Sequence, residues 1–360
     1  MSIHFHTLTI THIRKETDDC ISIAFDVPES LKQQFNFQQG QNITIRKIID
    51  GEELRRNYSI CSSPSQNELR VAIKRMPNGK FSNWANEHLR EGDALDVLPP
   101  TGKFNTKLDP SAQKHYLAFV AGSGITPVMS ILKTTLETEP QSRFTLVYGN
   151  KSRRSIIFRE ELEELKNRYM QRLQLIHLLS QEEPDSPLNF GRIDADKCHQ
   201  LTRGLIQLSS IDEVFICGPE AMIHAVRNTL EASGFPSAHI HFELFTTPGA
   251  AAAKQAARES RASVTGSMAR IKVKIDGVVT QFTLPQEGDS ILNAALRAGA
   301  DLPFACKGGM CATCKAKLLE GKVEMDVNYA LEAEEVKQGY ILTCQSHPLT
   351  ETVFVDFDQR

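Results

Sequence analysis

The spacing of cysteines near the C-terminal end constrains this chain more than any other feature. Cys306, Cys311 and Cys314 follow a C-x4-C-x2-C pattern, and Cys344 lies further along. Four thiolates in this arrangement are the ligands of a plant-type [2Fe–2S] cluster, three from one tight loop and one from a distant segment. A structural zinc site is the alternative, but zinc usually takes two short cysteine pairs. The pattern therefore predicts a module that carries single electrons.

The remaining composition narrows the class of protein. The other four cysteines lack disulfide-like spacing, which suits a reducing cytoplasm; they are Cys20, Cys61, Cys198 and Cys217. No stretch reaches 18 apolar residues, and the start lacks a signal-peptide pattern, so we expect a cytoplasmic protein without a membrane span. The net charge of −3 falls on residues 269–360, which hold 13 acidic and 10 basic side chains. This balance does not indicate a nucleic-acid partner.

Periodicity divides the chain into three domains and a linker. Residues 1–108 carry short strand-like runs separated by turn residues, which predicts an antiparallel β-barrel. Residues 112–245 alternate apolar strands with helical stretches, which predicts a doubly wound parallel sheet. Residues 246–268 are rich in Ala, Ser and charged side chains and predict a linker. Residues 269–360 predict a small α+β module that presents the cysteine loop.

Two glycine-containing junctions of the predicted parallel sheet each follow a strand and open a helix. The first reads Gly-x-Gly-x-x-Pro and contains Gly122, Gly124 and Thr126. The second reads Cys217, Gly218 and Pro219. Such junctions admit a pyrophosphate at the helix N-terminus, and the carboxyl ends of parallel strands meet in one crevice. The alternatives are a plain tight turn for the first junction and a buried small hydrophobe for Cys217.

Two patterns in the predicted barrel point to another phosphate-containing ligand. Arg56, Tyr58 and Ser59 lie on one strand and offer a cationic fork, a stacking face and a hydroxyl. The second pattern is the run Gly79, Lys80, Phe81 and Ser82. We expect Ser82 to cap a helix whose N-terminus binds an anion. Taken singly, such patterns are more often a strand with a solvated arginine or an ordinary capped helix.

The order of these motifs resembles the ferredoxin–NADP reductase superfamily over residues 1–245, and the C-terminal module resembles plant-type ferredoxins of β-grasp fold. The complete domain order is similar to that of the reductase components of bacterial oxygenases. This resemblance implies FAD as the flavin, although related reductases use FMN. It further implies that Arg56 grips the flavin phosphate, Tyr58 packs on the isoalloxazine and Ser59 hydrogen-bonds near its N5. The helix at Ser82 would hold the pyrophosphate.

The resemblance also implies roles around the nicotinamide. Thr126 and Cys217 would flank the ring, and Glu243 is the candidate acidic residue beside it. A carboxylate at a strand end is the alternative for Glu243. Together with Ser59 these residues are the predicted catalytic set.

A basic loop suggests which dinucleotide binds. Ser152, Arg153 and Arg154 follow the strand that ends at Tyr148. A 2′-phosphate requires cationic forks and hydroxyls at this strand end, so the sequence favours NADPH, with NADH possible. A solvated basic loop is the alternative.

These expectations combine into an electron path from NADPH through FAD and the [2Fe–2S] cluster to an external acceptor. The resemblance implies that this partner is the multisubunit di-iron oxygenase that epoxidises the phenyl ring of phenylacetyl-CoA. Two alternatives remain: a reductase for another oxygenase or redox protein, and a flavin-based redox sensor. A sensor requires an output module, and the sequence shows no DNA-binding helix pair or basic patch.

Overall fold

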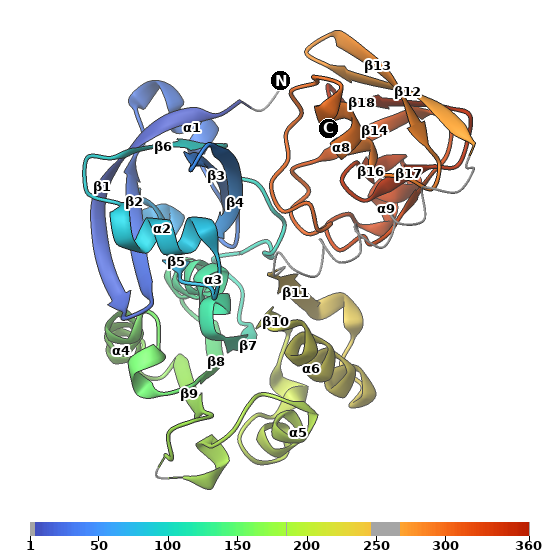
Figure 1. The fold of residues 1–360 in the computed structure, drawn as a ribbon. Helices are drawn as coiled ribbons and strands as arrows, with labels where there is room; N and C mark the ends of the chain where they lie inside the picture. Colours follow the sequence, from blue (N-terminus) through green and yellow to red (C-terminus); the bar gives the residue numbers. More distant parts are fainter. Residues whose placement is uncertain (1–3, 185, 246–266, 360) are drawn as a thin grey trace.

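Three bodies make up the protein in a computed structural model that describes residues 4–184, 186–245 and 267–359 (Figure 1). The predicted linker lies almost entirely outside the described residues. The last body begins with a strand at Met268, one residue before the predicted boundary. Within the described ranges, no helix is long and apolar enough to cross a bilayer.

A six-stranded antiparallel sheet forms the N-terminal body, with strand order β4-β3-β6-β1-β2-β5. Ile43 and Ile45, two apart on β3, are fully buried on its inner face. The sheet's edges approach each other where Ile60, just after β4, bridges Val71 of β5, so the sheet curls into the predicted barrel. Its elements are β1 (His6–Thr17), β2 (Cys20–Asp26), α1 (Lys32–Phe35), β3 (Asn42–Ile49), β4 (Glu52–Ser59), β5 (Leu69–Lys74), α2 (Lys80–His88) and β6 (Ala94–Val97).

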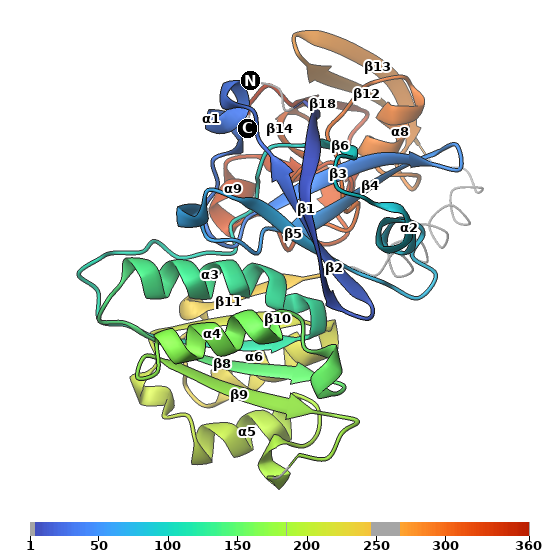
Figure 2. The ribbon, with the colours of Figure 1, turned by 90° about the vertical axis from the view of Figure 1, so that its left-hand side faces the viewer.

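The middle body is the predicted doubly wound sheet, with five parallel strands in the order β11-β10-β7-β8-β9. Helices α3 and α4 cover one face and α5 and α6 the other (Figure 2). The order reverses on either side of β7, and ligands bind at such switch points. The elements are β7 (His115–Ala121), α3 (Ile125–Thr138), β8 (Arg143–Asn150), α4 (Arg159–Arg168), β9 (Leu173–Leu179), α5 (Ala195–Gly204), β10 (Glu213–Gly218), α6 (Glu220–Ala232) and β11 (Ile240–Leu244).

The C-terminal body is a mixed five-stranded sheet in the order β13-β12-β18-β14-β16, packed on a short helix. Asp276 and Gly277 form the predicted turn between its first two strands, and both have positive φ. Ser290 caps the helix by accepting a hydrogen bond from the Asn293 amide. The elements are β12 (Met268–Ile275), β13 (Val278–Pro285), α8 (Ile291–Arg297), β14 (Lys315–Glu320), β15 (Val323–Met325), α9 (Ala333–Lys337), β16 (Tyr340–Leu342), β17 (Ser346–Pro348) and β18 (Thr352–Asp356).

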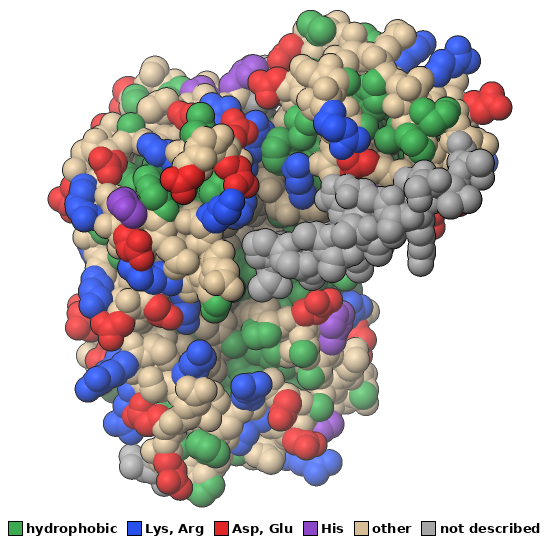
Figure 3. Space-filling model, viewed as in Figure 1, with side chains coloured by type: hydrophobic (Ala, Val, Ile, Leu, Met, Phe, Trp, Pro, Cys, Tyr) green, Lys and Arg blue, Asp and Glu red, His purple; other side chains and the backbone are tan. Residues whose placement is uncertain are grey.

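The barrel meets its two neighbours through different kinds of contact. Against the parallel-sheet domain it shares one apolar core, in which Phe104 packs edge-on against Phe215 with ring centroids 5.4 Å apart. Against the C-terminal module the contacts include the ion pair between Lys103 and Glu335 at 2.8 Å. Positive and negative side chains are interspersed on the face shown in Figure 3, so this face carries no continuous patch of one sign.

Candidate functional site

On β4, Arg56 and Tyr58 lie two residues apart and therefore share a face of the strand. Arg56 is half-buried and donates to the Arg55 carbonyl at 2.7 Å, and no carboxylate among the described residues forms an ion pair with it. The Tyr58 ring packs 5.7 Å from that of Phe81, and burial raises the pKa of its phenol. Arg56 has no acidic partner in the described part of the chain and could therefore pair with a flavin phosphate. The neutral ring of Tyr58 offers a stacking face for the flavin ring system.

The start of α2 corrects one detail of the sequence prediction. Gly79, not Ser82, is the N-cap, because the tight turn at Asn78 (φ +60°) leads directly into the helix. Ser82 is the third helical residue, and its hydroxyl accepts from the Met76 amide at 3.1 Å. No side chain caps this helix end. Its first amide groups therefore suit an anion such as the flavin pyrophosphate.

Lys80 and Phe81 occupy the first turn of the same helix. Lys80 forms an ion pair with Glu52 on β4, which joins the helix to the strand that carries Arg56. Phe81 is fully buried. The predicted flavin-binding residues of the barrel are thus brought together by one strand and one helix.

Three of the four predicted catalytic residues converge from separate segments. Ser59, at the end of β4, donates a hydrogen bond to Glu243 Oε2 at 3.2 Å across 184 residues of sequence. Glu243 pairs directly with Cys217 in the parallel register of β11 and β10. Thr126 is buried in the first turn of α3, where its hydroxyl donates to the Ser123 carbonyl at 3.0 Å, and its role at the nicotinamide stays a prediction.

Burial determines the protonation of this junction. It raises the pKa of Glu243 to about 8, although the hydrogen bond from Ser59 acts in the opposite direction. Burial likewise raises the pKa of the Cys217 thiol, which therefore stays neutral. The junction thus presents a carboxyl group that can hold a proton near neutral pH.

The two glycine junctions line one cleft of about 700 Å³, as predicted from their places at adjacent strand ends. A Cβ atom on Gly124 would lie 2.2 Å from the Cys217 carbonyl oxygen, so only glycine permits this approach of the two junctions. Gly122 has φ +55°, and Gly218 and Pro219 complete the wall. The cleft lies at the switch point of the sheet, where a dinucleotide binds.

The basic loop after β8 is divided between this cleft and the surface beyond it. Lys151 lines the cleft, and Arg192 faces it from the loop before α5. Ser152 instead begins a short helical turn, and Arg153 pairs with Glu182 at 3.3 Å. Sequence reasoning missed Arg192, since nothing local distinguishes it from a solvated arginine.

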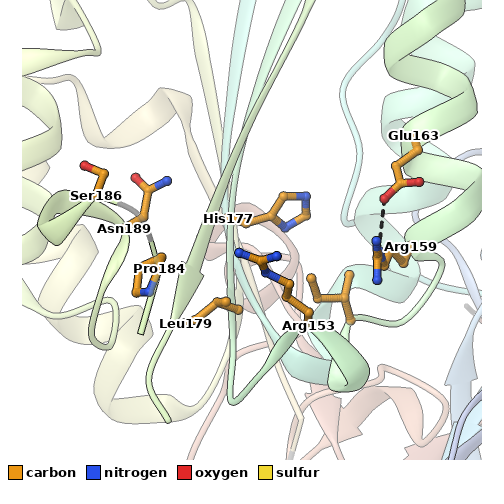
Figure 4. A pocket seen from close by; sticks show the side chains of 9 residues that line it. Arg153, Arg159, Glu163, His177, Leu179, Pro184, Ser186 and Asn189 are labelled. Atoms are coloured by element: carbon orange, nitrogen blue, oxygen red, sulfur yellow. Dashed lines mark hydrogen bonds and ion pairs between the residues drawn. The ribbon is translucent and has the colours of Figure 1, made fainter. Parts of the chain in front are cut away.

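A second hollow of about 310 Å³ adjoins this loop (Figure 4). Arg153 faces it from the loop after β8 and His177 from β9, while Arg159 pairs with Glu163 at its margin. Arg154 lines a third hollow with Arg153. The assignment of Ser152, Arg153 and Arg154 to a 2′-phosphate therefore stays a prediction.

The cysteine loop places four thiols in two pairs. Cys306 lies beside Cys311, and Cys344 lies beside Cys314. No group of three or more described His, Cys, Asp or Glu side chains is arranged to hold a single metal ion. Two pairs of sulfurs suit a binuclear cluster, with one pair for each iron, better than one zinc ion.

The backbone of the loop supplies hydrogen-bond donors to its sulfurs. The amides of Gly308 and Met310 donate to Cys306 Sγ at 3.3 and 3.4 Å. Positive φ angles occur at Lys307 and Gly309, so the backbone of the loop bends on either side of Gly308. Gln345 Nε2, which sequence reasoning missed, lies 3.6 Å from Cys344 Sγ. Such donors stabilise the negative charge of cluster-bound sulfur.

The cluster loop lies against the catalytic junction. A cleft of about 500 Å³ is lined by β11, including Glu243, on one side and by Met310, Cys311 and Thr313 on the other. Met310 also packs against the apolar core of the parallel-sheet domain. This places the cluster ligands next to the junction where flavin and nicotinamide are predicted to meet.

Comparison with known proteins agrees with this geometry. An oxidoreductase FAD-binding domain matches residues 7–106, an oxidoreductase NAD-binding domain residues 119–228, and a 2Fe-2S iron-sulfur cluster binding domain residues 273–349. The predicted FAD, NAD(P) and cluster domains are therefore confirmed. Phthalate dioxygenase reductase has the same architecture, with a TM-score of 0.58, 25% identity and 98% of both chains covered. Fold and site define a flavin- and iron–sulfur-dependent electron-transfer oxidoreductase.

Two relatives narrow this class. The chain is 47% identical to a subunit of 1,2-phenylacetyl-CoA epoxidase from Escherichia coli, over 99% of this chain and 98% of that protein. It is 36% identical to the ferredoxin reductase component of 3-ketosteroid-9-alpha-monooxygenase from Rhodococcus rhodochrous, over 97% and 96%. The chain belongs to this family of oxygenase reductase components.

Proposed function

We propose that this protein transfers electrons from NADPH, through FAD and a [2Fe–2S] cluster, to the di-iron oxygenase of a phenylacetyl-CoA epoxidase. The observation that carries the proposal is the 47% identity to a subunit of such an epoxidase over 99% of the chain. When bound, the flavin accepts two electrons as a hydride and the cluster accepts electrons singly. The eight free cysteines are consistent with a cytoplasmic location.

The residues of the barrel bind and orient the flavin. Arg56 and the uncapped start of α2 would neutralise its phosphates, and Tyr58, which packs beside Phe81, would pack on its ring. Ser59 extends toward Glu243, which defines the point where the reacting ring edge is held. Glu243, with its raised pKa, holds a proton at its carboxyl group beside this point. Fixed donors of this kind orient the reactants before the reaction begins.

The residues of the parallel-sheet domain hold the dinucleotide. The glycine junctions would hold its pyrophosphate, and Cys217 and Thr126 would flank the nicotinamide. Lys151 and Arg192 provide cations in the cleft itself, with Ser152, Arg153 and Arg154 further out along the loop. The positive charge of this loop favours NADPH over NADH.

Anaerobic titration with NADPH tests the electron path. Absorbance follows the flavin and electron paramagnetic resonance follows the cluster. We expect less than one equivalent of NADPH to bleach the flavin and generate the signal of a reduced [2Fe–2S] cluster. Addition of the epoxidase oxygenase component should then reoxidise the cluster, whereas an unrelated oxygenase should not. Failure to reduce the flavin would contradict the proposal.

Paired variants identify which cations recognise the 2′-phosphate. Lys151→Ala with Arg192→Ala, compared with Arg153→Ala plus Arg154→Ala, separates the cleft from the outer loop. Each charged contact to a phosphate contributes roughly 1.5–3 kcal/mol, so the responsible pair should weaken NADPH binding at least about tenfold and NADH binding little. Equal losses for both nucleotides in both variants would contradict a 2′-phosphate site here.

A further inference from the structure

One arginine of the barrel is almost fully buried between Phe5 and Glu53 of its own domain and the ferredoxin module. Arg55 precedes Arg56 on β4, and successive strand residues point to opposite faces, so the two side chains diverge. Only 7% of the Arg55 side chain is exposed. Its Nε donates to Glu53 at 2.8 Å within the barrel, while Nη1 donates to the Leu302 carbonyl of the ferredoxin module at 3.3 Å.

The same guanidinium reaches the segment that begins the cluster loop. It stacks on the Phe304 ring, 4.1 Å from the ring centroid, and Phe304 lies two residues before the ligand Cys306. Lys307 Nζ contacts that ring as well, at 4.5 Å. Arg55 therefore holds the loop by a stacked face and by a hydrogen bond at once, which an ammonium group cannot reproduce.

The charge of Arg55 is only partly offset by its neighbours. Glu53 and Asp301, the latter at 4.0 Å, face the guanidinium, while Arg46 and Lys307 add positive charge. A change in the cluster potential and a change in its position are therefore measured separately below.

We propose that Arg55 is a positioning residue for electron transfer, which fastens the cluster loop to the flavin barrel. The proposal rests on the function proposed above. The step it serves moves one electron from the reduced flavin to the oxidised cluster, which gains one negative charge. Electron transfer depends on the separation of donor and acceptor, so loosening this contact slows the step without altering flavin reduction.

Arg46 offers a matched control. It lies directly opposite Arg55 in the β3–β4 register, stacks on Phe5 at 4.1 Å and pairs with Asp96 at 3.0 Å. Within the described part of the chain, none of its hydrogen bonds, ion pairs or ring contacts reaches the ferredoxin module. Arg46 shares Phe5 and Glu53 with Arg55, and Arg46→Gln removes the same charge from the same face while leaving the direct contacts of Arg55 with Leu302 and Phe304.

The experiment compares wild type, Arg55→Gln, Arg55→Lys and Arg46→Gln after reconstitution to equal flavin and iron content. Stopped-flow mixing with NADPH measures flavin reduction and cluster reduction separately. Hydrogen–deuterium exchange of residues 300–312 in the oxidised, nucleotide-free protein measures docking without turnover. Redox titration measures the cluster midpoint potential.

For Arg55→Gln we expect cluster reduction to slow roughly tenfold, since a charged hydrogen bond and a cation–π contact are lost. Exchange in 300–312 should rise, while flavin reduction and the cluster potential stay as in wild type. The rate of cluster reduction in Arg55→Lys should fall between those of wild type and Arg55→Gln, and the rate in Arg46→Gln should match wild type. Unchanged cluster reduction in Arg55→Gln, or an equal defect in Arg46→Gln, would overturn the inference. Absence of flavin or cluster reduction in wild type would instead overturn the proposed function.

Discussion

The barrel's two interfaces differ in composition, so we expect the two neighbouring domains to differ in how readily they separate from the barrel. Toward the parallel-sheet domain, Phe104, Cys61 and Ala72 belong to one continuous apolar core, and Ser130 donates to the Ser62 carbonyl at 2.6 Å. Toward the ferredoxin module the contacts include an arginine stack on Phe304 and the ion pair of Lys103 with Glu335. Apolar cores persist in salt, whereas charged contacts weaken. The comparison indicates a fixed flavin–nucleotide unit and a separable ferredoxin module.

The variant with the largest expected effect removes the cluster and leaves the flavin–nucleotide unit intact. Cys344→Ser deletes the distant thiolate, so we expect loss of the cluster absorbance and of its paramagnetic signal. NADPH-to-ferricyanide turnover should remain near the wild-type rate, since ferricyanide accepts electrons from the flavin. Cys198→Ser, at a buried cysteine outside the cluster loop, is the control. Retained cluster absorbance in Cys344→Ser would refute the ligand assignment.

The next test targets the apolar interface. Phe104→Ala removes a ring that is almost fully buried against Phe215, which should cost about 3–5 kcal/mol of stability. Urea unfolding followed by flavin fluorescence and circular dichroism measures this loss. Phe304→Ala, at the barrel's interface with the ferredoxin module, should cost far less because Phe304 is only half-buried. Similar losses for both variants would show that the interfaces do not differ.

The smallest expected effect concerns Glu335 at the ferredoxin interface. Burial raises its pKa, but hydrogen bonds from Lys103 and the Glu332 amide outweigh this, so the net pKa is lowered. A lowered carboxyl pKa means that the ion pair with Lys103 favours docking above the usual glutamate range and is lost as pH falls through the lowered pKa. Glu335→Gln reproduces the uncharged side chain at neutral pH without acid damage to the cluster.

Because Lys103 is largely exposed, we expect Glu335→Gln to slow cluster reduction only a few-fold, within the roughly 0–1 kcal/mol typical of such pairs. The wild-type rate should fall toward that of the variant as salt is added. Stopped-flow reduction at several ionic strengths measures both. A wild-type rate that does not respond to salt would count against electrostatic docking.

The parts of the site that depend on local sequence could be predicted, and those that depend on convergence could not. The predicted cluster ligands Cys306, Cys311 and Cys314 lie in one loop, so their spacing alone indicated their chemistry. The glycine junctions were expected to line one crevice, and they line one cleft, because strand-to-helix turns at a switch point require small residues. The contact between Ser59 and Glu243 spans 184 residues, and only the family resemblance placed both residues near the flavin and nicotinamide.

Two further residues show where local reasoning fails. Ser82 has the composition of an N-cap, but the turn at Asn78 places the cap three residues earlier, at Gly79. Arg55 has no local feature that separates it from a solvated arginine, since Phe304, on which it stacks, lies in another domain. Burial by a distant partner leaves no periodic pattern in a single strand.

The neighbouring arginines of β4 also limit how this protein can be altered. Arg55 and Arg56 lie on opposite faces of one strand, so in the function proposed above the hairpin of residues 42–59 would serve ferredoxin docking and flavin binding with a single backbone. Deleting or inserting one residue ahead of them would exchange the two faces and abolish both contacts together. The hairpin can therefore accept substitutions that retune docking, but its length is fixed. A ferredoxin module from another reductase would have to be matched to it by changes of side chain alone.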